Sequence, residues 1–328
     1  MNPFHDIAHR ILAERPDPAV RVRLLRDALH ISSENPELIR AKTDLEKSRW
    51  VAMLRDAQKQ DGSWGRFHSE DTKQKQDIPT TEFGVERARA LGLDISHPIM
   101  DKAIQYLVRL LEGQIEFPDP PEKNDRWPTG TQLFAASTLA RIQPDHAALN
   151  ETLDLWTAIA EKAFASGAYD PEAEIEAHRQ LTDASVKNSY LRLNGKYQLT
   201  LLSARSNLLS HKTETSLVSW LRHRKEGIGY LDMPLTRPNL HFTPSQMERW
   251  FTSVEIMSRF SAWRAWASEI EMWIMKDHNR DDAWDFGPRA SHSAFMPLSE
   301  NWKTKSARMI DWRTRTLLLM KQFELLKT

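Results

Sequence analysis

The chain of 328 residues contains no cysteine. This absence excludes disulfide bonds, a thiolate nucleophile and any zinc site with a cysteine ligand. Glycine is scarce, with eleven residues, which disfavours glycine-rich nucleotide-binding loops. No apolar run approaches the roughly 20 residues that cross a bilayer, and no apolar signal segment follows Met1. We therefore expect a cytoplasmic protein.

Neither sign of charge predominates. The 45 Lys and Arg residues balance 45 Asp and Glu residues, so the formal net charge is zero. A nucleic-acid-binding protein usually carries a basic excess, and we therefore expect no nucleic-acid partner. Hydrophobic residues make up 40% of the chain, which is enough for a large core and excludes global disorder.

Tryptophan is abundant, with twelve residues, and several of them lie in an internal repeat. Leu54 and Gln58 predict a helix that ends in a turn containing Gly62 and Trp64. Similar segments end at positions 64, 117, 169, 231 and 284, which are 52 to 62 residues apart. Further helices are expected between these copies, several of them just after a proline, at 19–31, 80–92, 129–142, 196–209, 245–260 and 306–326. Strand patterns are almost absent.

Each period is therefore a helical hairpin, and a single hairpin cannot bury its apolar face alone. Two concentric sets of about six helices would close into an α/α toroid with a central cavity. The alternative is an open solenoid, but tetratricopeptide and HEAT repeats have shorter periods. We expect an all-α fold: a single α/α toroid domain over residues 1–328, with an N-terminal helical region at 1–35 and repeats over roughly 36–328.

The first repeat also carries a recognisable motif. A basic residue, Arg49, begins a helix that ends Leu-x3-Gln-x3-Gly-x-Trp at Trp64, and this matches the QW motif. Trp50 and Met53 depart from it. The chain thus resembles the squalene–hopene cyclase and prenyltransferase superfamily, as a single terpenoid cyclase-like toroid. The resemblance implies an isoprenoid (polyprenyl) substrate or another apolar small molecule in a central apolar cavity.

The resemblance also directs attention to carboxylates that could act as acids or bases. Cyclases of this superfamily protonate their substrate with an Asp-x-Asp-Asp motif, which is absent here. The nearest stretch runs from Asp77 to Glu82, where Pro79 takes the place of the acid. Glu255, flanked by apolar residues, would either pair with a cation such as Arg259 or sit protonated in a dry cavity. The candidate catalytic residues are Glu82, Glu255 and Asp311.

Candidate substrate-binding residues lie on the helices expected to face the cavity or at the N-terminal ends of these helices. Aromatic faces stabilise positive charge, whereas arginines bind diphosphate or acidic head groups. The plainer alternatives are core packing for the aromatic residues and a solvated charged face for the arginines. The candidates are Phe83, Trp127, Tyr197, His241, Trp250, Phe251, Trp302, Arg308 and Arg313.

One motif suggests a metal. Asp281, Asp282 and Asp285 spell the Asp-Asp-x-x-Asp sequence that binds magnesium and diphosphate in class I terpene synthases. The repeat offers another explanation, because acidic residues are common in its closing turn. Mg²⁺ is therefore a candidate cofactor. The zinc site of protein prenyltransferases cannot be carried over, since it requires a cysteine.

Two other functions remain open. A glycan-active α/α-barrel enzyme would use paired carboxylates in a polar cleft. A non-catalytic lipid-binding protein or interaction scaffold would need neither the acid nor the metal, and a scaffold would have a centre filled by side chains. The apolar run at 316–326 predicts a core helix, with a peripheral membrane contact as the alternative.

Overall fold

The computed structural model describes residues 3–182, 184–185, 189–236, 242–277, 284–288 and 296–325. Within these ranges the chain forms 14 helices and no strand, and 59% of the chain is helical. The all-α prediction is confirmed. No helix in the described ranges combines the length and the apolar character needed to cross a membrane.

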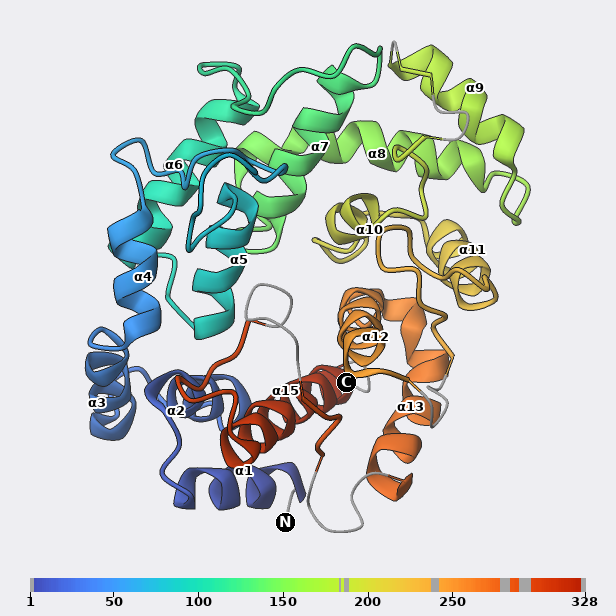
Figure 1. Ribbon diagram of the computed structural model, residues 1–328. Coiled ribbons are helices and arrows are strands. Elements are labelled where there is room, and N and C mark those ends of the chain that lie inside the picture. The colour runs from blue at the N-terminus through green and yellow to red at the C-terminus, as the bar shows by residue number, and fades with distance from the viewer. Residues whose placement is uncertain are drawn as a thin grey trace.

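Six helices line a central cavity, and each corresponds to a helix expected from the sequence (Figure 1). The first ends in a π-helical segment at Leu24–Ala28, and the third predicted range, 129–142, is displaced slightly toward the N-terminus. The lining helices are α2 (Pro18–Arg23), α5 (Thr81–Leu91), α7 (Trp127–Ala140), α10 (Lys196–Leu202), α12 (Pro244–Met257) and α15 (Lys305–Leu325).

The other helices pack outside these six. Their apolar sides join the lining helices in one hydrophobic core, which contains several fully buried tryptophans. Two short 3-10 segments, Ala147–Leu149 and Ser261–Trp263, precede two of them. The outer helices are α1 (Pro3–Ala13), α3 (Pro36–Leu45), α4 (Arg49–Ala57), α6 (Pro98–Leu111), α8 (Asn150–Ala163), α9 (Pro171–Leu181), α11 (His211–Arg222) and α13 (Arg264–Asp277).

Helix starts follow the signals read from the sequence. The hydroxyl of Thr80 accepts a hydrogen bond from the Phe83 N–H and so begins α5. Thr243 and Gln246 form a capping box ahead of α12, with Pro244 at its first position. The predicted set of helices was wrong in two respects, the length of one helix and the absence of another. Helix α10 ends at 202 rather than 209, and α9 was not predicted, although an additional helix accounts for the longest repeat interval, from 169 to 231.

The same kind of hydrogen bond occurs in two closing turns of the predicted repeat. The indole N–H of Trp64 donates to the Leu54 carbonyl at 2.9 Å, and that of Trp284 donates to the Ile274 carbonyl at 3.3 Å. Both bonds span ten residues. Each indole therefore closes its turn onto the preceding helix. A side chain on Gly84 would approach the Trp64 ring to 2.4 Å, so this close approach requires glycine.

The lining helices contact one another in chain order. Helix α2 contacts α5, α5 contacts α7, α7 contacts α10, and α10 contacts α12. Helix α15 is joined to α12 by ion pairs and returns to contact α1 and α2, beside which it lies in Figure 1. The C-terminal helix thus meets the N-terminal helices, and an ion pair between Arg313 and Glu14 fastens them.

Candidate functional site

The central cavity has a volume of about 950 Å³. Eight Asp or Glu residues and eight Lys or Arg residues contribute to its lining. The cavity is therefore highly charged, which differs from the apolar cavity expected from the sequence. An apolar part is present as well. It is formed by Phe83, Leu231, Met296, Leu298, Leu318 and Leu319.

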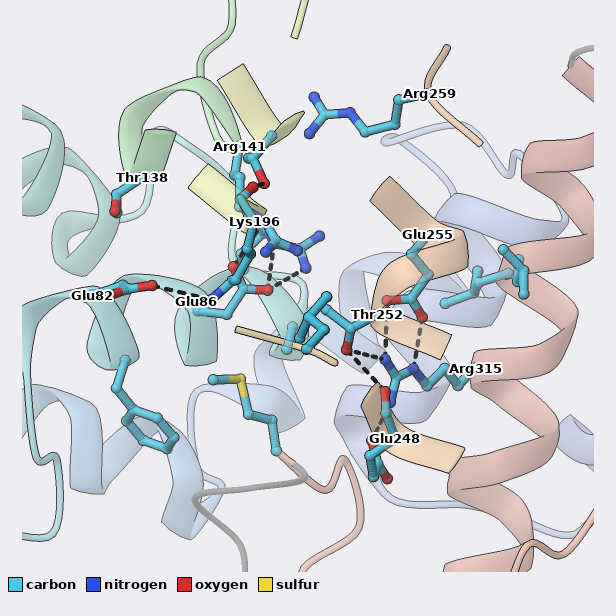
Figure 2. A pocket seen from close by; sticks show the side chains of 18 of the residues that line it. Glu82, Glu86, Thr138, Arg141, Lys196, Glu248, Thr252, Glu255, Arg259 and Arg315 are labelled. Atoms are coloured by element: carbon cyan, nitrogen blue, oxygen red, sulfur yellow. Dashed lines mark hydrogen bonds and ion pairs between the residues drawn. The ribbon is translucent and has the colours of Figure 1, made fainter. Parts of the chain in front are cut away.

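An arginine cluster lines part of the cavity and is made of Arg89 on α5, Arg141 just after α7 and Arg259 just after α12. Arg141 and Arg259 are labelled in Figure 2. Glu86 accepts from Arg89 Nε at 3.0 Å, and its other oxygen lies 3.1 Å from Arg141 Nε. Burial tends to raise the pKa of Glu86, but the two guanidiniums hold it well below its ordinary value. Glu86 is therefore ionised, and one carboxylate is shared by two arginines.

The third member of the cluster, Arg259, has a different environment. Among the described residues its side chain makes no ion pair or hydrogen bond, and Figure 2 shows it extending free of any dashed line. Burial and the positive charges of Arg141 and Arg89 lower its pKa to about 10. Arg259 nevertheless remains charged at neutral pH. An unpaired, largely desolvated guanidinium beside two others is favourable only if an anion joins it.

Glu255 pairs with a cation, which was the first of the two alternatives, but the cation is Arg315 of α15 and not Arg259. Arg315 Nε lies 2.6 Å from one Glu255 oxygen and Nη2 lies 3.0 Å from the other. Arg315 also donates to Glu248 and, at 3.1 Å, to Thr252 (Figure 2). Burial alone would lower the pKa of Arg315, but the two carboxylates raise it above its ordinary value. We call this group the Arg315 bridge.

Glu82 lies at the start of α5 and accepts hydrogen bonds from three groups. The Tyr197 hydroxyl lies 2.9 Å from Oε2, His68 Nδ1 lies 2.9 Å from the same oxygen, and Lys196 Nζ lies 3.2 Å from Oε1. Burial would raise the pKa of Glu82, but Lys196 and His68 lower it to about 2. This direction is opposite to the one that a general acid requires.

Asp311 also lines the cavity, although its side chain is buried. It accepts hydrogen bonds from the N–H groups of Leu298 and Ser299, at 3.1 and 3.0 Å, and from the Ser299 hydroxyl at 2.6 Å. These bonds hold the segment that precedes α15 against the helix. The contacts therefore give Asp311 a role in positioning the cavity wall.

The candidate aromatic residues divide into two groups. Phe83 and Tyr197 line the cavity. The others do not: they pack in the core or near it, as the plainer alternative supposed. Trp250 donates to the Thr236 carbonyl, Phe251 packs against Trp312, Trp127 lies against Phe117, and Trp302 is buried beside Lys303. His241 lies outside the described residues.

The two predicted arginines are engaged elsewhere. Arg308 forms two hydrogen bonds, of 2.9 and 2.8 Å, with Asp285, and Arg313 pairs with Glu14. Neither lines the cavity. Asp281 and Asp282 lie outside the described residues, so the Asp-Asp-x-x-Asp prediction is only partly visible. In the parts of the chain that are described, no group of three or more His, Asp or Glu residues could hold a metal ion.

Sequence reasoning missed the residues that give the cavity its charge. These are His68, Arg89, Arg141 and Lys196. A signal existed for one of them, Arg89, which follows Glu86 by three residues on a helix that was expected to face the cavity. No signal marked His68, because it lies in the loop between α4 and α5.

Comparison with known proteins provides no relative. No family matches the sequence, and neither a curated protein nor a solved structure matches it significantly. The functional argument therefore depends on the cavity itself.

Proposed function

We propose that this chain is a terpenoid cyclase-like α/α toroid whose central cavity binds an amphipathic anion of the isoprenoid diphosphate class. The observation that carries the proposal is Arg259, a charged side chain that faces the cavity beside Arg89 and Arg141 without a carboxylate partner in the described structure. Diphosphate oxygens match guanidinium donors in geometry and charge.

The toroid part of the proposal has its own support. Consecutive lining helices contact one another and α15 returns to α2, as a closed set of hairpins requires. The indole bonds of Trp64 and Trp284 repeat at the same spacing in two closing turns. Both features agree with the QW-like repeat, although the evidence for the family remains the motif alone.

The apolar chain of the ligand would lie over the apolar part of the cavity. Leu318 is half-buried and faces the cavity, next to the buried Leu319. A prenyl chain of farnesyl size contains about fifteen carbons, and burial of each CH₂-sized group contributes about 0.8 kcal/mol. The cavity is large enough to count against a centre filled by side chains, which the scaffold alternative predicts. The glycan alternative needs a protonated carboxyl, whereas the pKa values of Glu82 and Glu86 are lowered.

Calorimetry with three probes tests this proposal: farnesyl diphosphate, farnesol and inorganic diphosphate. Farnesyl diphosphate is expected to bind more tightly than either of the other two. Arg259→Gln should weaken binding of both diphosphates about tenfold or more, because a charge-assisted hydrogen bond contributes about 1.5–3 kcal/mol. The same change should leave farnesol unaffected. Leu318→Asn should weaken farnesyl diphosphate and farnesol but leave inorganic diphosphate unaffected.

Arg308→Gln is the matched control, since Arg308 is paired with Asp285 away from the cavity. Its affinity for all three probes should equal that of the unmodified protein. Absence of farnesyl diphosphate binding, or equal binding by the Arg259→Gln variant, would overturn the proposal.

A further inference from the structure

His68 is held at the cavity by a carboxylate from another part of the chain. Asp119 is buried and accepts from three consecutive backbone N–H groups, those of Phe67, His68 and Ser69. The last two bonds measure 3.0 and 2.7 Å. The imidazole ring stacks on Phe134 with 4.4 Å between the ring centres. Both the backbone and the ring of His68 are therefore fixed, as expected for a group that must be accurately placed.

The contacts of His68 also determine its tautomer. Nδ1 lies 2.9 Å from Glu82 Oε2, and Glu82 is ionised, so this oxygen can only accept. The proton of the neutral ring is thereby assigned to Nδ1. Nε2 then carries the free electron pair, and no described residue donates a hydrogen bond to it. A carboxylate that orients imidazole in this way is the arrangement of a general base.

The His68 site and two members of the arginine cluster meet on α5. Glu82, which binds His68, and Glu86, which binds Arg89 and Arg141, lie about one helical turn apart on that helix. Lys196 binds Glu82, and its charge also lowers the pKa of Glu86. The charge of Glu82 in turn acts on Arg141. A phosphate group held by the arginine cluster would therefore lie close to the groups that position His68.

We propose that His68 is the general base of a phosphoanhydride hydrolysis carried out on the diphosphate ligand in this cavity. His68 Nε2 takes a proton from a water molecule while the water oxygen attacks the terminal phosphorus of the diphosphate. The bond from that phosphorus to the bridging oxygen breaks, and the bridging oxygen keeps the electron pair. The products are inorganic phosphate and the prenyl monophosphate, and the proton on His68 passes to solvent. This inference rests on the proposed diphosphate site.

The cavity suits hydrolysis better than carbocation chemistry. Its charged lining favours water, whereas a carbocation needs a water-poor apolar surface. Protonation of an alkene needs a carboxylic acid, but Glu82 and Glu86 are both ionised at neutral pH. Arg89 and Arg141 could neutralise the charge that develops on phosphate oxygens in the transition state.

The test incubates the full chain with farnesyl diphosphate in ¹⁸O-labelled water and analyses the products by mass spectrometry. Farnesyl monophosphate should form, with the label in inorganic phosphate. His68→Gln should lower kcat at least a hundredfold, the usual contribution of a general base, while Kd for farnesyl diphosphate changes less than threefold. His211→Gln, at the exposed start of α11, is the matched control and should leave kcat unchanged.

Two further readouts separate proton transfer from a structural role. Added imidazole should restore part of the turnover of the His68→Ala variant. The acidic limb of the kcat profile of the unmodified protein should be missing from the residual activity of His68→Gln. The groups that face His68 are Glu82 from α5, Tyr197 and Lys196 from α10, and the Tyr230 ring.

The outcomes distinguish this inference from the binding proposal. If farnesyl diphosphate binds but no monophosphate forms, the binding proposal stands and the hydrolase is overturned. Release of diphosphate through cleavage of the C–O bond, or unchanged kcat in His68→Gln, would also overturn it. If farnesyl diphosphate does not bind, both proposals fail.

Discussion

The arginine cluster and the Arg315 bridge line the same cavity, but their balance of charge is opposite. In the Arg315 bridge one guanidinium satisfies two carboxylates, Glu248 and Glu255. In the arginine cluster Arg89 and Arg141 share Glu86, and Arg259 has no described partner. The bridge holds two carboxylates and one guanidinium and carries a net negative charge, whereas the cluster holds three guanidiniums and one carboxylate and carries a net positive charge. Similar residues therefore form a paired joint in one part of the cavity and leave a guanidinium without a described partner in another.

The largest expected effect comes from breaking the bridge. Arg315→Met leaves Glu248 and Glu255 with uncompensated charge and should lower the free energy of unfolding by about 3–5 kcal/mol. Urea denaturation measures this change. Restoring neutrality with Glu248→Gln and Glu255→Gln in the same chain should recover most of the loss. A triple variant as unstable as the single one would show that packing, rather than charge, maintains the joint.

Glu82 provides the next effect, which depends on pH. Its pKa is lowered from 4.5 to about 2 in the folded protein, so its contribution to stability is complete above about pH 4.5 and is lost as the pH falls through 2. We expect the stability difference between the unmodified protein and Glu82→Gln to shrink by about 3 kcal/mol over this range, at about 1.4 kcal/mol for each unit of pKa. Urea titrations at successive pH values measure it. A constant difference would contradict the ionised Glu82.

A smaller effect, of opposite sign, is expected at Arg259. Arg259→Met removes an unpaired charge that repels Arg89 and Arg141, and it should raise the free energy of unfolding by about 1 kcal/mol in the absence of ligand. Thermal unfolding without added anions measures the gain. A substantial loss of stability would mean that Arg259 has a structural partner, and the contrast with Arg315 would disappear.

The smallest effect should come from Arg308, which lies in neither group. Arg308→Met breaks the pair with Asp285, in which both side chains are partly exposed, and should cost about 1 kcal/mol or less. Ligand affinity should not change. A large loss of affinity after this substitution would place the anion site at Arg308 and Asp285, where the sequence first suggested it.

The helices could be predicted from the sequence because their signals are local. Prolines, capping residues and the Gln58–Trp64 turn specify where helices begin and end, independently of distant contacts. The length of helix α10 was overestimated because residues 203–209 contain no strong helix breaker. In the structure Asn207 nevertheless adopts a positive φ.

The candidate site was less predictable, because its partners come from distant segments. Glu255 pairs with Arg315, which lies 60 residues away, and not with the neighbouring Arg259. Asp119 accepts a hydrogen bond from the backbone of His68, 51 residues away. No spacing rule connects such positions. Glu82 was found as a cavity residue, but its pKa depends on Lys196 and could not be read from the first turn of a helix.

The contact between α15 and the N-terminal helices has a consequence for synthesis. Arg313 reaches Glu14 across 299 residues, so this contact cannot form until α15 has left the ribosome. Before that moment the nascent helices form an open stack whose cavity lacks one wall. A ligand that contacts both α5 and α15 can bind only after α15 has packed. By mass action such a ligand stabilises the state in which α15 is packed. The cavity occupant would then also act as a template for the final step of folding.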